Sequence, residues 1–238
     1  RLASPAGFAR HTSGGLWKPA RHLLLLNRIL LAAAAGEPWA QRIIIEMPPR
    51  HGKSEFVSGH FPAWYLGLYP DRKVILASYG DDLATFYGQR NRDLLDRYGP
   101  ELFGVRVRQD SSAKGRWLIQ RHRGYMVSAA MGGQITGRGG NLLIVDDPIK
   151  SGAEALSPTY REAHKPWWRS TFRNRLEQPG AIVVIQTRWH QDDLAGWLLK
   201  SGDESWLRIS LPAIAEEDEA IYLPDDPDTP AWTRAAGE

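Results

Sequence analysis

The sequence contains no cysteine and no apolar run long enough to cross a membrane. Without cysteine the chain has neither a disulfide framework nor a thiolate metal site, so its stability must come from packing. A membrane-spanning helix needs about 18 to 20 consecutive apolar residues. The most apolar stretch, residues 23–31, is interrupted by Asn27 and Arg28. These absences argue against a small disulfide-bonded domain and a membrane-spanning helical protein, and they are typical of an intracellular globular protein.

Basic side chains are unevenly distributed along the chain. The net charge is only +3, but the 30 Lys and Arg residues are mostly Arg and form local clusters. The clusters are Arg90 with Arg92, Arg106 with Arg108, Arg116 with Arg121 and Arg123, and Arg169 with Arg173 and Arg175. Guanidinium groups bind phosphate through a planar fork of donors, so the clusters are compatible with a polyanionic partner. They are equally compatible with solvated surfaces and local ion pairs.

The distribution of apolar residues predicts an α/β fold. With 238 residues, of which 42% are hydrophobic and 24% charged, the chain can form one large domain, or one domain with an appendage. Apolar runs of strand length occur at residues 43–47, 74–78, 117–120, 125–128, 142–146, 182–186 and 207–211. Most are unbroken runs of Val, Ile and Leu, which are typical of strands buried on both faces of a parallel sheet.

Helical periodicity separates most of these runs. It occurs at residues 19–34, 53–68, 82–98, 158–176 and 192–200. Residues 106–130 contain successive strands without a helix between them, which indicates an antiparallel excursion. We expect an N-terminal helical segment over residues 1–40, the core over residues 41–215, and a last segment over residues 216–238. The last segment is acidic and rich in Pro and Ala, so it is expected to be a linker or tail toward a missing domain.

A candidate phosphate-binding loop follows the first predicted strand. Residues 46–55 read EMPPRHGKSE and contain the Gly-Lys-Ser that closes the pattern G-x-x-x-x-G-K-[ST], although Met47 replaces the first glycine. Backbone N–H groups of residues 50–53 would surround the β-phosphate, Lys53 would reach the β- and γ-phosphates, and Ser54 would hold Mg²⁺. Gly-Lys-Ser also arises by chance, but here it stands between a predicted strand and a predicted helix, as the pattern requires.

A pair of carboxylates ends the predicted strand 142–146. In LLIVDDPIK, Asp146 and Asp147 follow an unbroken apolar run, where a buried strand delivers a carboxylate to a metal ion beside the phosphate loop. In this Walker B arrangement Asp146 would coordinate Mg²⁺, directly or through water. Asp147 occupies the position at which a glutamate commonly polarises the attacking water. The alternative is that both aspartates cap the turn before Pro148.

Polar residues also end the predicted strand 182–186, in AIVVIQTRWH. Ligands bind at the carboxyl ends of parallel strands, so Thr187 is placed to contact the γ-phosphate or its water and to relay the loss of the phosphate. Alternatively, Thr187 and Asp192 only cap the following helix. His190 is conceivable as a metal ligand, but no nearby residue completes a ligand set.

Two arginines are candidates for contact with phosphate. Arg50 lies inside the phosphate loop and is expected to be close to the nucleotide. Arg138, in TGRGGN, lies on a glycine-rich loop before the strand 142–146, and this loop could present it to the nucleotide of a neighbouring subunit. The alternative for Arg138 is a local salt bridge.

Four segments together resemble the ATPase domain of the large terminase subunit of tailed bacteriophages, the motor that packages viral DNA. They are, in order, MPPRHGKSE, GGQITGRGGNLLIVDDPIKSGAEA, WWRSTFRNRL and VVIQTRWHQDDLAGWLL. The resemblance covers roughly residues 15–215. It implies a RecA-like P-loop ATPase core with a mainly parallel central sheet flanked by helices, using ATP and Mg²⁺. It also implies a homo-oligomeric ring on the portal protein, translocation of double-stranded DNA, a small terminase subunit as partner, and action in the host cytoplasm.

The resemblance further implies roles for individual residues. The nucleotide-binding residues would be Pro49, Arg50, His51, Gly52, Lys53 and Ser54, with Trp17 and His22 of the segment WKPARH on the adenine side. Asp146 would be the metal carboxylate, Asp147 the catalytic acid, Thr187 the coupling residue and Arg138 a finger acting in trans. Asp147 departs from the family pattern, because many members carry glutamate there, and its carboxylate is one methylene shorter.

Family members also carry a carboxyl-terminal nuclease, and nothing after Leu211 could house one. The resemblance therefore leads us to expect a motor domain that hydrolyses ATP without cutting DNA. The competing interpretation is a helicase or DNA-remodelling ATPase. Such proteins typically have two RecA-like domains or a hexameric ring and an acidic box D-E-x-[DH], whereas this box reads Asp-Asp-Pro-Ile. A non-enzymatic binder is disfavoured because Lys53, Ser54 and Asp146 are all present.

Overall fold

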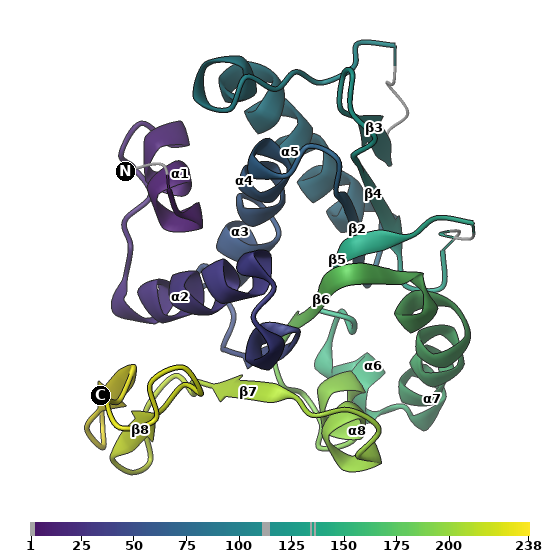
Figure 1. The fold of residues 1–238 in the computed structure, drawn as a ribbon. Coiled ribbons are helices and arrows are strands. Elements are labelled where there is room, and N and C mark those ends of the chain that lie inside the picture. Colours follow the sequence, from purple (N-terminus) through teal and green to yellow (C-terminus); the bar gives the residue numbers. More distant parts are fainter. Residues whose placement is uncertain (1–2, 111–114, 134, 136) are drawn as a thin grey trace.

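A seven-stranded, mainly parallel sheet forms the centre of the protein (Figure 1). The computed structural model describes residues 3–110, 115–133, 135 and 137–238. The strands of this sheet are β1 (Arg42–Glu46), β2 (Lys73–Ser78), β3 (Arg116–Leu118), β4 (Tyr125–Ala130), β5 (Gly140–Asp146), β6 (Leu176–Gln186) and β7 (Leu207–Ser210). Their order is β3-β4-β2-β5-β6-β1-β7, and every neighbouring pair is parallel except β3 with β4. The predicted mainly parallel α/β core is confirmed.

The predicted antiparallel excursion is smaller than expected. Strand β3 runs antiparallel to β4, and Val107 forms an antiparallel bridge with Ile119, whereas β4 itself pairs in parallel with β2 and belongs to the main sheet. The long helix between β2 and β4, α5 (Asp81–Leu102), provides the crossover that a parallel pair requires. The missing helix between β3 and β4 therefore correctly indicated that β3 is antiparallel to β4, but it gave no information on how β4 pairs with the rest of the sheet.

Helices cover both faces of the sheet (Figure 1). Besides α5 they are α1 (Pro5–Thr12), α2 (Arg21–Ala35), α3 (Lys53–Val57), α4 (Phe61–Leu68), α6 (Gly152–Leu156), α7 (Pro158–Trp167) and α8 (Leu194–Ser201). Among the described residues, no helix combines the length and the apolar character needed to span a bilayer. The short helices α1 and α6 were not predicted, because each is too brief to show a helical period. Each begins at a serine cap, which was the one local signal for it.

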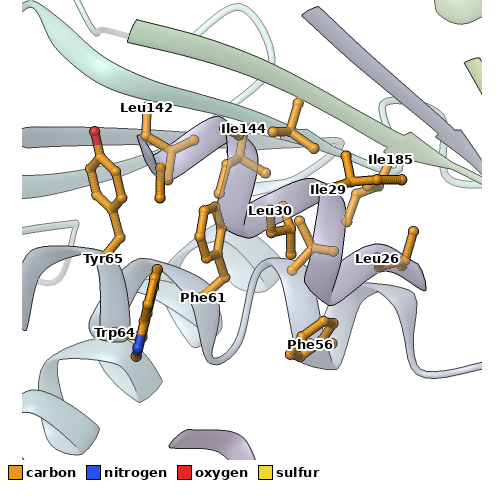
Figure 2. Packing of buried hydrophobic residues seen from close by; sticks show 14 of the residues in the cluster. Leu26, Ile29, Leu30, Phe56, Phe61, Trp64, Tyr65, Leu142, Ile144 and Ile185 are labelled. Atoms are coloured by element: carbon orange, nitrogen blue, oxygen red, sulfur yellow. The ribbon is translucent and has the colours of Figure 1, made fainter. Parts of the chain in front are cut away.

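Alternate residues of the buried strands face opposite helical layers. In β1, Ile43 and Ile45 pack in the cluster that includes α1 to α5, whereas Ile44 packs in the cluster that includes α7 and α8. Figure 2 shows the first cluster, in which α2, α3 and α4 meet β5 and β6; its labelled residues are Leu26, Ile29, Leu30, Phe56, Phe61, Trp64, Tyr65, Leu142, Ile144 and Ile185. Burial on both faces explains why the strands are unbroken apolar runs.

Residues 53–68, predicted as one helix, form two. Helix α3 ends at Val57 and α4 begins at Phe61. Pro62 lies in the first turn of α4, where a missing N–H leaves no helical carbonyl unpaired. In a continuous helix the same proline would remove an interior hydrogen bond and clash with the preceding turn. The break places the buried His60 between the two helices.

The predicted helix 158–176 also ends early. Helix α7 stops at Trp167 and is followed by a π-helical turn, Trp168–Phe172, and a 3₁₀ turn, Arg173–Arg175. Pro166, inside α7, lacks the N–H that a regular helix would use. The wider turn lets Trp167, Trp168 and Phe172 all pack in the second core cluster. Strand β6 then begins at the residue where the helix was predicted to end.

Residues 216–238, predicted to be a linker or tail, contain a small two-stranded sheet. Strands β8 (Glu219–Ile221) and β9 (Trp232–Arg234) form an antiparallel hairpin. The hairpin packs on α2: the guanidinium of Arg21 lies 5.2 Å from the centre of the Trp232 ring, and Arg28 pairs with Asp225 at 3.0 Å. Composition suggested a tail because this small structure is held by one buried indole and by ion pairs with a distant helix, which leave no apolar period.

Candidate active site

Strand order brings three predicted site segments to one edge of the sheet. Strand β6 lies between β1 and β5, so the carboxyl ends of these three strands are adjacent. The phosphate loop leaves β1, the carboxylate pair ends β5, and Thr187 follows β6. This is the edge at which parallel α/β sheets bind their ligands.

The phosphate loop has a left-handed backbone at two positions. Gly52 has φ 78° at the N-cap of α3, and Arg50 has φ 65°. Glycine adopts such angles without steric penalty, whereas an arginine does so rarely. At the start of the loop the N–H of Met47 donates to the carbonyl of Gln186 at 3.2 Å. A backbone contact to β6 thus holds the loop at the position where the usual pattern has glycine.

Lys53 is the centre of the site. Its side chain is almost fully buried, and its Nζ lies 3.0 Å from Oγ1 of Thr187 and 3.2 Å from Oδ2 of Asp147. Because a buried ammonium needs a compensating charge, these contacts fix its position. One cation therefore links the phosphate loop to the ends of β5 and β6.

Asp147 is held in a strained and well-defined orientation. Its φ is 43°, a region rare for residues other than glycine. Its Oδ1 accepts a hydrogen bond from the N–H of Thr187 at 2.7 Å, and its own N–H donates to the carbonyl of Ile185 at 2.8 Å. Such strain at a polar residue persists where the surroundings fix it, often at functional sites. The alternative that Asp147 merely caps the turn before Pro148 does not account for its contacts with β6 and Lys53.

Asp146 is completely buried and lies beside Ser54. The Ser54 hydroxyl donates to Oδ1 of Asp146 at 2.8 Å, while Oδ2 has no hydrogen-bond partner among the described residues. Burial, reinforced by the negative charge of Asp147, raises the pKa of Asp146 to about 7. A buried carboxylate oxygen with a free lone pair and a neighbouring hydroxyl are the hard oxygen donors that Mg²⁺ prefers. The residues present therefore fit the predicted metal site.

Two further polar groups near Asp146 were not predicted. Ser78 ends β2, pairs in register with Asp146, and has a buried hydroxyl without a hydrogen-bond partner among the described residues. Burial, together with the charge of Asp146, raises the pKa of Tyr87 on α5 to about 12. Sequence alone could have indicated Ser78, since it is the polar end of an apolar strand. Tyr87 gave no such signal, because it sits on a helix whose approach to β5 depends on the tertiary fold.

A cavity of about 580 Å³ lies on the N-terminal side of the phosphate loop. Its lining includes Trp17, His22 and Arg50. Trp17 is mostly buried against the ring of Phe56, with ring centres 5.1 Å apart, and Nε2 of His22 is 2.9 Å from the carbonyl oxygen of His51. The structure thus places both predicted adenine-side residues beside the loop, where they also support its conformation.

Arg138 lies at the opposite edge of the sheet. It precedes the first residue of β5, whereas Asp146 ends that strand, and a strand of this length spans about 20 Å. The loop is held at this edge because the Tyr125 hydroxyl donates to the carbonyl of Gly139 at 2.8 Å. The structure therefore does not bring Arg138 to the Lys53 of its own chain. Its action on a neighbouring nucleotide stays a prediction.

His190 takes part in a local turn. Its Nδ1 accepts a hydrogen bond from the N–H of Asp192 at 3.0 Å. Asp193, not Asp192, caps α8, by accepting from the N–H of Gly196 at 3.0 Å. Within the described ranges, no group of three or more His, Cys, Asp or Glu residues is arranged to hold a metal ion.

A network of buried charges below the site was also missed. Glu46, the last residue of β1, is almost fully buried and pairs with Arg188 and with Arg208 of β7. Arg188 also pairs with Asp193 at 2.9 Å. The sequence signal was a glutamate ending an apolar strand, but its two partners are far away in the chain, one in the loop after β6 and the other on β7.

Comparison with known proteins agrees with this architecture. Residues 44–230 match the family described as terminase large subunit, T4likevirus-type, N-terminal. The structure is similar to the HK97 bacteriophage large terminase, with a TM-score of 0.51 and 13% sequence identity over 76% of this chain and 37% of that chain. It is also similar to the large terminase of a thermophilic bacteriophage in complex with ATP-gamma-S, with a TM-score of 0.50 and 14% identity over 79% of this chain and 43% of that chain.

At these identities the structural likeness concerns the fold alone, and the chain spans less than half the length of the two structures. A search among curated proteins gave no match. The family match covers most of the chain and includes the phosphate loop, the carboxylate pair and Thr187. The protein belongs to the T4likevirus-type terminase large subunit family, of which it carries the N-terminal region.

Proposed function

We propose that this protein hydrolyses ATP to drive double-stranded viral DNA into an empty capsid. The observation that carries the proposal is the joint contact of Lys53 with Thr187 and Asp147, next to the pair formed by Ser54 and Asp146. These groups come from three strand ends and serve no common structural purpose. They match the parts that a phosphoryl-transfer site needs, namely a cation, a metal carboxylate and a residue that positions water.

Nucleotide binding would use the phosphate loop and the cavity beside it. The triphosphate would lie along residues 50–54, with the base toward the cavity lined by Trp17 and His22. The large terminase of the thermophilic bacteriophage was solved with ATP-gamma-S, which supports the same ligand class here. Mg²⁺ would be held by Asp146 and Ser54 and would neutralise charge on the β- and γ-phosphates.

Hydrolysis would require this chain to position one water molecule. Asp147 would orient the water and accept its proton as the oxygen attacks the γ-phosphorus and the bond to the β-phosphate oxygen breaks, giving ADP and phosphate. Lys53 would stabilise the charge that develops on the phosphoryl oxygens. Thr187 contacts both residues, so loss of the γ-phosphate would change its surroundings first.

An exposed basic face supports DNA as the partner. The backbone of residues 106–108 pairs antiparallel with residues 118–120, and Val107, Ile119 and Trp117 point into the core. The alternate positions and the adjoining turn therefore direct basic side chains outward; they are Arg106, Arg108, Arg116, Arg121 and Arg123. Asp110 pairs with Arg108, so part of this charge is compensated. The remaining guanidinium groups suit the phosphates of a duplex.

The assembled motor would be a ring of copies of this chain on the portal protein, working with a small terminase subunit in the host cytoplasm. Arg138 supports the ring, because it is too far from its own nucleotide site to act there. In a ring, its edge of the sheet would face the nucleotide of the next subunit. Gly137, directly before Arg138, has a left-handed backbone with φ 76°, which glycine adopts without strain.

The test is ATP turnover with and without double-stranded DNA. We expect wild-type protein to release phosphate from ATP, faster with DNA, and Lys53→Ala protein to be inactive with or without DNA while retaining its circular dichroism spectrum. The matched control is Lys73→Ala, because Lys73 also pairs with a carboxylate, that of Glu177 at 2.8 Å, but at the opposite edge of the sheet. Turnover by Lys53→Ala equal to wild type would overturn the proposal. ATP-driven separation of duplex strands would favour the helicase alternative.

A further inference from the structure

Arg188 connects the residue that contacts Lys53 to the start of the phosphate loop. It directly follows Thr187, and its guanidinium donates to Oε1 of Glu46 and to Oδ2 of Asp193. The same guanidinium donates to the carbonyl of His190 at 3.2 Å. One side chain thereby joins the end of β1, the loop after β6 and the cap of α8.

The surroundings of Arg188 require a planar, charged fork. Both carboxylates that it contacts have side chains only 2% exposed, so neither can exchange its partner for water. Arginine presents donors in several fixed directions, whereas lysine is a point charge on a flexible stem. A lysine at this position would keep the charge and lose the simultaneous contacts.

Thr187 directly follows Gln186, the last residue of β6, so the sheet holds it from one side only. Its N–H and Oγ1 are engaged with Asp147 and Lys53, the two residues assigned to the chemistry. Along the chain after Thr187, Arg188 is the first residue that ties it to the rest of the fold without taking part in hydrolysis. A shift of Arg188 would move Thr187, Asp147 and Lys53 relative to one another.

We propose that Arg188 is a positioning residue for ATP hydrolysis, which holds Thr187 in the geometry that aligns Asp147 and Lys53 with the γ-phosphate. The inference rests on the proposed ATPase function and adds a residue that touches neither nucleotide nor metal. Because the ground-state contacts of the triphosphate lie mainly on the phosphate loop, Arg188 affects turnover far more than nucleotide affinity.

Arg208 provides a matched control. It pairs with the other oxygen of the same carboxylate, Oε2 of Glu46, at 2.9 Å. However, it lies on β7, its side chain is 50% exposed, and it has no chain connection to Thr187. If Glu46 merely stabilises the fold through its arginines, replacement of either arginine should have similar consequences.

The experiment compares Arg188→Lys with Arg208→Lys. For each variant we would measure the kcat of ATP hydrolysis, the Kd of a fluorescent ATP analogue, and the thermal unfolding temperature. We expect Arg188→Lys to lower kcat by about 10- to 100-fold, since small misplacements of catalytic groups have effects of this size, with Kd changed by less than about threefold. Arg208→Lys should retain the wild-type kcat. A kcat of Arg188→Lys within twofold of wild type, or equal losses in both variants, would overturn the inference.

Asp193→Asn addresses the case in which Arg188→Lys does not fold. Asparagine keeps the cap of α8 and removes only the charged contact with Arg188. This variant should fold and show a smaller loss of kcat, again with little change in Kd, and a wild-type kcat would count against the inference. The wild-type assay separates the two proposals: if wild-type protein hydrolyses no ATP, the proposed function fails, whereas active wild type with an equally active Arg188→Lys defeats only the role of Arg188.

Discussion

Oδ2 of Asp147 lies 3.2 Å from Nζ of Lys53, while Oδ1 of the same carboxylate accepts the N–H of Thr187 at 2.7 Å. Both oxygens are thus engaged by groups of the site itself. A nucleotide that draws Lys53 toward its phosphates would release Oδ2, and the carboxylate would remain held through Oδ1. In the proposed mechanism this contact would supply an oxygen that becomes available for water when ATP binds.

This relationship predicts separate effects for the two aspartates. Asp147→Asn should bind ATP analogues with Mg²⁺ nearly as wild type does, because Asp146 and Ser54 remain, but should lose turnover. Asp146→Asn should weaken Mg²⁺-dependent binding, since it removes the buried charge beside Ser54. Titration of a fluorescent ATP analogue with and without Mg²⁺, together with a phosphate-release assay, measures both effects. Equal losses of affinity and rate in Asp147→Asn would make it a second metal ligand instead.

The position of Arg138 predicts complementation between inactive subunits. An arginine finger contributes about 10³–10⁵ in rate, so Arg138→Ala should bind nucleotide normally and hydrolyse it poorly. Mixing it with Lys53→Ala protein should restore part of the turnover, because one type of interface combines an intact lysine with an intact arginine. The assay needs a concentration at which wild-type turnover rises more than linearly with protein. Mixtures no more active than the sum of their parts under that condition would leave Arg138 with a local structural role.

The basic face formed by Arg106, Arg108, Arg116, Arg121 and Arg123 predicts a salt-dependent contact with duplex DNA. Arg106→Gln combined with Arg116→Gln should weaken binding of unrelated DNA sequences to a similar degree. The slope of log K against log salt should become less steep by about 0.9 for each phosphate contact removed. Arg10→Gln, at an exposed position on α1, is the control with the same change of charge per site. Fluorescence anisotropy without ATP measures the slope, and an unchanged slope would place the DNA elsewhere.

Buried histidines predict that the fold loses stability in mild acid. Burial lowers the pKa of His60 below the usual 6.5, and the nearby charge of Arg90 acts in the same direction. Burial also lowers the pKa of His164. Since the unfolded chain binds these protons more readily, the histidines do not reduce stability above pH 6.5 and do so increasingly as the pH falls below it.

Urea unfolding between pH 8 and pH 5 should show this contribution, by at most about 1.4 kcal/mol per pH unit for each histidine. Asp146 acts in the opposite direction over the same range, because its raised pKa lets the folded protein bind a proton that the unfolded chain does not. Nδ1 of His60 donates to the carbonyl of Glu55 at 2.9 Å, and His60→Gln keeps a donor there without a titrating ring. The variant should have a flatter pH profile than wild type. A profile as steep as that of wild type would assign the acid sensitivity to other groups.

The sheet and the main site were predictable because their signals are local. Unbroken apolar runs identify strands buried on both faces, and a polar residue at the end of such a run lies at the ligand-binding edge. Lys53, Asp146 and Thr187 could therefore be named before their distances were known. The resemblance to terminases gave the fold class independently of these patterns.

The remaining features depend on partners that are distant in the chain. Glu46 is held by Arg188 and Arg208, which are 142 and 162 residues away, and nothing near it indicates either. Tyr87 comes within the influence of Asp146 only because α5 crosses the sheet. Arg138 lies at the amino end of β5 because it precedes that strand. The glycine-rich motif around Arg138 does not specify this position. Sequence patterns identify chemical groups, whereas long-range pairing determines which of them meet.

After the C-terminal hairpin, the chain returns to Ala215, the residue from which the hairpin segment departs. The N–H of Ala215 donates to the carbonyl of Glu238 at 2.9 Å, and the N–H of Gly237 donates to the carbonyl of Ala215 at 2.8 Å. The two ends of residues 216–237 are therefore held next to each other by backbone hydrogen bonds. Residues 216–237 could therefore be replaced by a short glycine linker without redirecting the chain after β7. Arg21 and Arg28 would then lose their contacts with Trp232 and Asp225. Since the residue after Arg21 is His22, whose Nε2 lies 2.9 Å from the carbonyl oxygen of His51, such a protein would show whether the hairpin stiffens the phosphate loop.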